Sequence, residues 1–163
     1  MKKNIRFYLL QFIIILFFPI KAYSLIEVDI TRGNLNPLPV AVSPLSIDNN
    51  SQKKFETLLK KKNIGEEISS IVENNLRTSG LFNPLSKDAF LQAPDIANLK
   101  PRFEDWNLIK AQALITGKVT NVEDKLRVEF RLWDVLAGKE MMALAFTTVP
   151  TNWRRVGHII TDK

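Results

Sequence analysis

The sequence predicts an α/β (α+β) domain: a mixed, roughly five-stranded sheet with two main helices packed on one face and a truncated helix at the C-terminal end. Two observations carry this prediction. Short segments that alternate apolar and polar residues, typical of strands with one buried face, occur early in the chain and throughout its last third. Between them, apolar residues recur at helical spacing. Strand pairs with helices interposed indicate helices packed against a mixed sheet.

The first 24 residues have the three parts of a secretory signal peptide. Two lysines and an arginine give a positive start, a largely apolar run follows, and Ala22 and Ser24 place small residues where a signal peptidase cuts. The alternative is a membrane anchor, but a spanning helix needs roughly 20 apolar residues and this run has about 14. We therefore expect export and cleavage between Ser24 and Leu25.

Removing the leader changes the charge of the chain. The full sequence holds 23 basic and 17 acidic residues, and the leader takes away four basic residues and no acidic ones. The remaining 19 basic and 17 acidic residues nearly balance. They do not indicate a nucleic-acid-binding protein, which needs a concentrated basic face. Five lysines gather within residues 52–62, and we assign them to a solvated loop or helix end with no function. The absence of cysteine excludes thiol catalysis and zinc–thiolate sites.

The first strand is expected directly after the leader. Its apolar residues alternate with acidic ones, which predicts one buried face. In chain order its residues are Leu25, Ile26, Glu27, Val28, Asp29, Ile30 and Thr31. A short apolar run at 40–42, bounded by prolines, predicts a second strand.

The clearest helix is predicted to begin after Asn63. Asn63 and Glu66, three residues apart, have the spacing of a capping box. Apolar residues then follow on one helical face, and Gly80 stands where a helix commonly ends in a left-handed residue. The apolar residues of this face are Ile64, Ile68, Ile71, Val72 and Leu76. A short amphipathic helical turn at 55–59 is expected before it, and extended chain at 81–84 after it.

The second half is predicted to supply most of the sheet. The proline-containing stretch 87–102 indicates a surface crossing, and 103–109 a second, short helix. The strands are expected at 113–119, 126–132 and 142–148, with turns at 121–125 and 137–139 and a last helix from 150. Trp133 falls on the polar, solvent-facing side of its strand, so it marks either a contact surface or ordinary packing.

Catalytic and metal-binding patterns are weak. The chain has one histidine, His158, and Asp162 four residues later could pair with it on one helix face. Such a pair could orient a base for a serine nucleophile, but no nucleophile turn is present. We favour a structural pair and predict no catalytic residue, cofactor or metal.

Four stretches resemble the N-terminal domain of the TolB family and occur in that family's order. They are LRTSGLFNPL at 76–85, FEDWNLIKAQALITGKV at 103–119, VEFRLWDVLAGK at 128–139, and a closing W-R-x-x-x-H-x-x-x-D helix at 153–162. The resemblance implies a non-enzymatic periplasmic protein whose N-terminal α/β domain precedes a six-bladed β-propeller. It also implies a role in the Tol-Pal system, which supports outer-membrane integrity and envelope constriction at cell division.

The resemblance carries expectations for individual segments. The mature N-terminus, residues 25–31, would contact a TolA-like inner-membrane protein, and the Pal contact would belong to the propeller. The closing helix, with Trp153, Arg154, His158 and Asp162, would lead from one domain to the next. We thus expect 1–24 as a signal peptide, 25–32 as an N-terminal strand or tail, 33–150 as the α/β domain, and 151–163 as the start of a linker helix toward a propeller that this chain lacks.

Two other functions remain open at this point. One is a periplasmic binding or activator module that acts on cell-wall synthesis proteins, although the closing helix at 153–162 counts against it. The other is a small hydrolase that uses His158. For a protein-interaction module of the Tol-Pal system, neither a nucleic acid nor a small-molecule substrate is expected.

Overall fold

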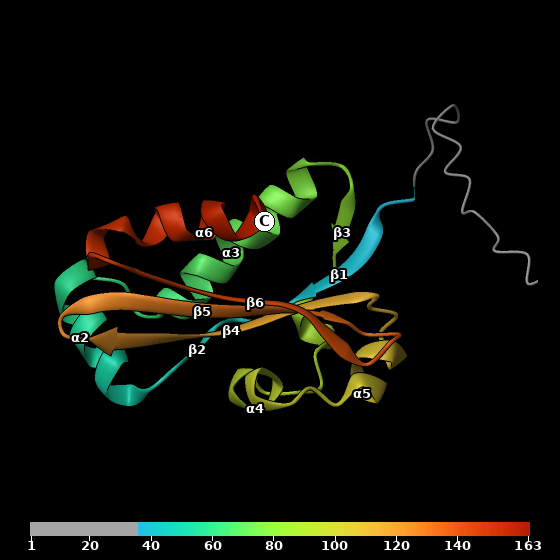
Figure 1. The fold of residues 1–163 in the computed structure, drawn as a ribbon, viewed down its shortest axis with the longest axis horizontal. Coiled ribbons are helices and arrows are strands. Elements are labelled where there is room, and N and C mark those ends of the chain that lie inside the picture. The colour runs from blue at the N-terminus through green and yellow to red at the C-terminus, as the bar shows by residue number, and fades with distance from the viewer. Residues whose placement is uncertain (1–35) are drawn as a thin grey trace, which may run out of the picture. The chain divides into compact units, whose positions relative to one another are not determined.

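A computed structural model describes residues 36–163, which form a mixed sheet with helices on both faces (Figure 1). The expected strand at 25–31 lies outside the described residues. The strands are β1 (Leu38–Val42), β2 (Ser46–Ile47), β3 (Phe82–Pro84), β4 (Ala113–Val122), β5 (Lys125–Asp134) and β6 (Lys139–Thr148). The α-helices are α2 (Asn49–Leu59), α3 (Ile64–Thr78), α4 (Pro94–Leu99), α5 (Phe103–Leu108) and α6 (Trp153–Thr161), and short 3-10 turns lie at η1 (Lys87–Ala89) and η2 (Pro150–Asn152).

The long strand β4 is the centre of the sheet, whose order is β3-β1-β4-β5-β6 with β2 also on β4. On one side β4 is parallel to β1 and β2, and on the other it is antiparallel to β5. The antiparallel strands β4, β5 and β6 follow one another through short turns, whereas the parallel pair β1 and β3 needs the crossover that α2 and α3 supply.

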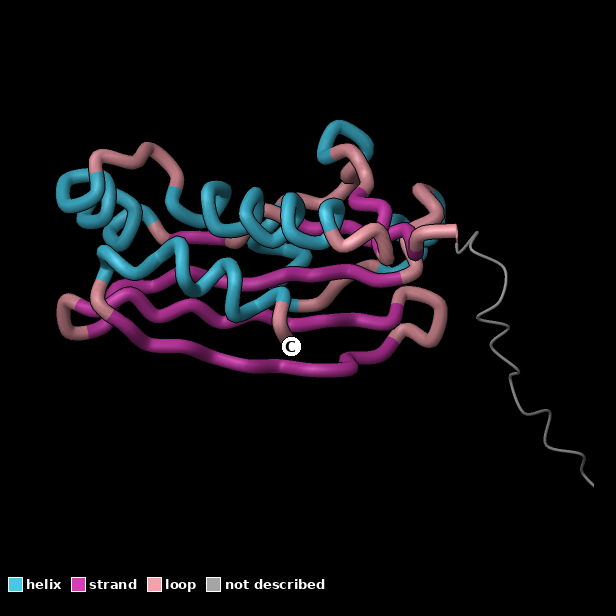
Figure 2. The backbone as a smooth tube through the Cα atoms, turned by 90° about the horizontal axis from the view of Figure 1, so that it is seen from above, coloured by secondary structure: helices cyan, strands magenta, loops and turns pink. Residues whose placement is uncertain are grey.

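One face of the sheet is covered by α3 and α6, which lie along the strands (Figure 2). The expected apolar face of α3 packs here: Ile64, Ile68 and Val72 are fully buried. They pack against every second residue of the strands, and the apolar face of α6 packs on the same side of the sheet. The sheet residues of this main core are Val40, Val42, Ile115, Val119, Leu126, Val128 and Phe130.

The opposite face has a smaller core under α4 and α5 (Figure 1). Trp106 of α5 is buried, and its Nε1 donates to Gln92 Oε1 at 2.7 Å. Leu114 on β4 and Val135 after β5 complete this layer with Ala41 and Ala111. The prediction that β5 has a solvent-facing side was therefore wrong at its C-terminal end.

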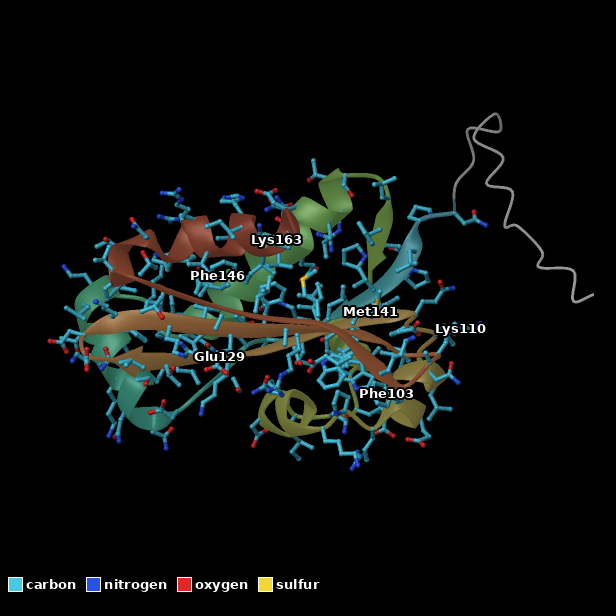
Figure 3. All side chains as sticks on the ribbon, viewed as in Figure 1. Phe103, Lys110, Glu129, Met141, Phe146 and Lys163 are labelled. Atoms are coloured by element: carbon cyan, nitrogen blue, oxygen red, sulfur yellow. The ribbon has the colours of Figure 1, made fainter. Side chains whose placement is uncertain are left out.

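Trp133 lies within this second layer. Its indole Nε1 donates to Thr116 Oγ1 at 2.9 Å, and its ring meets the edge of Phe103 with centroids 5.9 Å apart. In Figure 3, Phe103 lies on the α5 side of the sheet and Phe146 on the α6 side. Trp133 thus joins α5 to the sheet, and of its two predicted roles packing is the one the structure has.

Helix α2 begins two turns earlier than its apolar residues predicted. Asp48 Oδ1 accepts hydrogen bonds from the backbone N–H groups of Asn50 and Ser51, and Oδ2 accepts from Ser51 Oγ at 2.7 Å. Ser51 Oγ in turn accepts from Asn121 N at 2.8 Å, so the cap also ties the helix to β4. A cap of this kind defines a helix start without any apolar signal.

One of the two hydrogen bonds predicted for the capping box of α3 is present. Asn63 Oδ1 accepts from Glu66 N at 3.1 Å, which satisfies one of the free amides of the first turn. Among the hydrogen bonds of the described residues, the return bond from the Glu66 side chain is not made. Gly80 has φ of 71°, which confirms the left-handed position expected after the helix.

The fold class is confirmed, and three details differ from the prediction. The sheet of the described residues has six strands, because the two-residue strand β2 also pairs with β4. The second short helix at 103–109 packs on the opposite face to α3, so the two helices that share a face are α3 and α6. A further helix, α4, lies within the stretch 87–102 that was expected to be irregular. No helix within residues 36–163 is long and apolar enough to cross a membrane.

The Asp48 cap predicts a pH-dependent contribution to stability. The Ser51 backbone N–H, followed by the Ser51 hydroxyl, holds the pKa of Asp48 below its ordinary value of 3.8. A lowered pKa in the folded state means that the stabilisation is present above that ordinary value and is lost as pH falls through the folded pKa. Asp48→Ala should cost about 1 kcal/mol of unfolding free energy near neutral pH.

Urea unfolding at neutral and acidic pH measures this contribution. The gap between the wild type and Asp48→Ala should narrow as the carboxylate is protonated. Asp48→Asn is the matched control, because it keeps an oxygen acceptor but cannot titrate. An equal gap between wild type and Asp48→Ala at both pH values would contradict the assignment.

Candidate functional site

The closing helix α6, predicted to lead to a second domain, is part of the main core. Trp153, Val156 and Ile160 are buried against α3 and the sheet. The helix approaches α3 closely at Gly157, where an added Cβ would stand 2.9 Å from both Cβ and Cγ2 of Ile71. A residue without a side chain is therefore required at this crossing. The division of the chain at residue 150 remains a prediction.

Trp153 holds two cations from different parts of the chain. Arg154 Cζ lies 4.6 Å and Lys61 Nζ 5.8 Å from the ring centroid. Both distances are within the range of cation–π attraction. The indole is thus buried in the core with its accessible part covered by positive charge.

His158 has a different partner from the predicted one. Its Nδ1 is 2.9 Å from Asn75 Nδ2, which also donates to Thr161 Oγ1 at 3.0 Å. The Asn75 amide can only donate through this atom, so His158 Nδ1 accepts. Within residues 36–163 no ion pair joins His158 to Asp162; instead Asp162 N donates to the backbone oxygen of His158. The predicted pair was wrong because the neighbouring helix α3 supplies a nearer partner for the exposed ring.

The surroundings of His158 do not make a catalytic site. A base for a serine nucleophile needs an orienting acceptor on one ring nitrogen and the hydroxyl near the other. Here Nδ1 is occupied by an amide that joins two helices. In the described part of the chain, histidine, aspartate and glutamate also do not gather in groups of three that could hold a metal ion. What these residues offer chemically is a polar surface on a rigid helix pair.

The exposed edge of β6 is a surface feature that the sequence reasoning did not single out. Among the described residues β6 pairs only with β5, so one side of its backbone has no partner strand. Met141 and Leu144 are exposed large apolar residues on this strand. A shallow groove beside it is lined by Phe146 and Thr148 of β6 and by Asn152, Arg155, Val156 and Ile159 near α6. The sequence offers one indication of this edge, because β6 is the last strand before the closing helix.

The segment expected to contact a partner, residues 25–31, lies outside the described residues. Its assignment therefore rests on the sequence. Trp153, Arg154 and His158 lie in α6 and Asp162 caps its C-terminal end; Trp153 is buried, whereas the other three residues are exposed. Only the last three could meet another domain directly.

Crowding at the helix crossing predicts the effect of substituting Gly157. Gly157→Leu should destabilise the domain by roughly 1–3 kcal/mol, because the new side chain must displace Ile71 or separate the helices. Thermal or urea unfolding measures the loss. Combining it with Ile71→Ala opens space at the contact, so the double variant should lose less than the two single losses added together. Full additivity, or a Gly157→Leu chain as stable as the wild type, would contradict this packing.

Comparison with known proteins places these features in a family. The sequence profile of the TolB amino-terminal domain matches residues 26–141. "Tol-Pal system protein TolB" of Pelagibacter ubique (strain HTCC1062) is 79% identical over 157 residues, which cover 95% of this chain and 35% of that relative. The chain therefore spans about a third of the length of this relative.

A solved structure of a TolB protein shares the fold. The crystal structure of TolB from Acinetobacter baumannii superposes with a TM-score of 0.59 at 21% identity, covering 77% of this chain and 27% of that one. The LpoB C-terminal domain from Escherichia coli has a TM-score of 0.49 at 13% identity, covering 72% of this chain and 86% of that domain. With the profile match over most of the described sheet and helices, the chain belongs to the TolB amino-terminal domain family.

Proposed function

We propose that this chain is a non-catalytic protein-interaction module of the Tol-Pal envelope system, acting in the periplasm in support of outer-membrane integrity and constriction at division. The observation that carries the proposal is the 79% identity to a Tol-Pal system protein over 95% of the chain. The leader at 1–24 supports export, with cleavage after Ser24. The single histidine, engaged by Asn75, supports a binding role over catalysis.

The first proposed contact is made by the mature N-terminus with a TolA-like inner-membrane protein. An extended segment can add to the edge of another sheet, where backbone hydrogen bonds give affinity and alternate side chains give specificity. In residues 25–31, Ile26, Val28 and Ile30 would fill apolar positions on the partner. Glu27 and Asp29 would face the other way and select a basic surface. A contact with Pal is proposed only for the propeller of the longer relatives.

The second proposed contact is between α6 and the domain that follows it in longer relatives. Packing against α3 fixes the direction of this helix. Arg154 and His158 on this helix and Asp162 at its C-terminal cap are exposed, so they could contact a neighbouring domain. Their polarity suits the mixed, partly hydrated surface typical of interfaces between domains of one chain.

A peptide of residues 25–36 tests the first contact. Titrated into the isotopically labelled C-terminal domain of the TolA-like protein, it should give saturable chemical-shift changes along one sheet edge. Val28→Asp places a charge on the apolar side and should weaken binding at least tenfold, because a buried unpaired charge costs more than about 1.4 kcal/mol. Absence of any saturable change at about 1 mM peptide would remove the claim.

A scrambled peptide of the same composition is the matched control. It keeps both acidic charges but loses the alternation, so it should not compete. Equal binding by the scrambled peptide would show that charge alone attracts the segment. The edge-strand mechanism would then be wrong.

A further inference from the structure

The lysine-rich segment at 52–62, to which the sequence assigned no role, forms the outer part of α2 and the turn after it. Lys53, Lys60 and Lys62 are exposed, and Lys60 ends the helix with a left-handed backbone, φ of 53°. The buried side of the helix is made by Ser51 and Phe55. Its lysines therefore lie on surfaces that the domain itself does not cover.

A second segment, about ninety residues away in sequence, brings more positive charge to the same place. Helix α6 begins beside the end of α2, at the end of the sheet where the β4–β5 turn also lies (Figure 1). Trp153 joins the two segments, because Lys61 and Arg154 both lie over its ring. Arg155 follows on the exposed side of α6. We call this set the basic end: Lys53, Lys54, Lys60, Lys61, Lys62, Arg154 and Arg155.

Five of the seven cations of the basic end have no ion-pair partner among the described residues. In the described residues, Lys61 pairs with Glu67 at 3.0 Å and Lys54 pairs with Asp124, but the other members of the basic end make no ion pair. The same segments hold six acidic residues, so the seven cations of the basic end exceed them by a single charge: Asp48, Glu56, Glu66, Glu67, Glu123 and Asp124. Clusters of like charge repel one another, so an anionic partner would lower the free energy of this surface.

An exposed apolar residue interrupts the basic end. Leu58, one turn from Lys54 on α2, has 56% of its surface exposed. A lysine one turn from an exposed leucine is a combination that helices on a membrane surface use, because the apolar residue can enter the headgroup region while the ammonium group meets phosphates.

We propose that the basic end binds the surface of a membrane rich in anionic phospholipids. The charged groups are spread over α2, the turn after it and the first turn of α6, which suits a broad surface better than a peptide held in a groove. Lysine predominates over arginine, and its flexible point charge needs no fixed geometry from the partner. The inference goes beyond the proposed function, since it concerns a lipid surface, lies apart from residues 25–31 and shares only Arg154 with the proposed inter-domain contact.

Vesicle sedimentation tests the proposal with the chain purified from the periplasm of an expressing bacterium. Vesicles of phosphatidylcholine with about 40% phosphatidylglycerol should bind it, pure phosphatidylcholine should not, and binding should fall as salt rises from low to physiological concentration. The variant Lys53→Gln, Lys60→Asn, Lys62→Gln removes three charges that make no ion pair, and asparagine tolerates the left-handed position. It should lower the partition coefficient about 100-fold, at roughly fivefold per lysine.

The matched control removes three exposed lysines that lie elsewhere: Lys100→Gln, Lys118→Gln, Lys139→Gln. Its net charge equals that of the first variant, so retained binding would place the interaction at the basic end. Equal loss in both variants, or no binding by the wild type, overturns the proposal. Binding to soluble polyglutamate but not to vesicles would also overturn it, since the partner would then be an acidic polypeptide. Loss of the TolA-like contact by Val28→Asp leaves this measurement unaffected, so failure of either proposal is distinguishable.

Discussion

The burial of β4 on both faces is the constraint on which the rest of this domain depends. Ile115 and Val119 point into the main core, and Leu114 and Thr116 point the opposite way into the smaller one. Each neighbour of β4 must then carry two sets of residues of opposite parity, one for each layer. A shift of one residue in any pairing would exchange the layers, so the register of β1 and β5 is strongly specified.

The two layers leave different surfaces for other molecules. On the main face α3 and α6 are locked by the contact of Gly157 with Ile71, so the side chains exposed on α6 keep a fixed position. At the end of the sheet, the Asp48–Ser51–Asn121 network anchors α2 and with it the basic end. Surfaces on rigid helices present side chains with little loss of entropy on binding. The fold therefore suits an adaptor, in which the positions of the contact residues matter more than any chemistry between them.

Much of the fold could be predicted because its signals are local and repeated. The helical spacing of Ile64, Ile68 and Val72 and the alternation of Leu126, Val128 and Phe130 each report a buried face directly. What the sequence did not show depends on partners far away in the chain. Trp133 appears solvent-facing by parity alone, and only the packing of Phe103 against it covers that side.

The missed elements have equally specific causes. The prolines of 87–102 indicated a surface crossing, but proline is well suited to the first turn of a helix, and Arg131 Nη1 donates to Asn98 O near the end of α4 at 3.0 Å. Strand β2 is too short to show alternation. For the candidate site, spacing placed Asp162 within reach of His158, but the side chain of Asn75 on another helix could not be foreseen from local sequence. The basic end was similarly invisible, since only the fold brings Lys61 and Arg154 to one indole.

The edge of β6, which has no partner strand among residues 36–163, affects how the purified protein behaves. From Met141 to Thr148 this strand carries no charged residue and no proline, the two devices that most often stop exposed strands from joining their copies. Concentrated solutions should therefore favour edge-to-edge pairing between the β6 strands of different molecules.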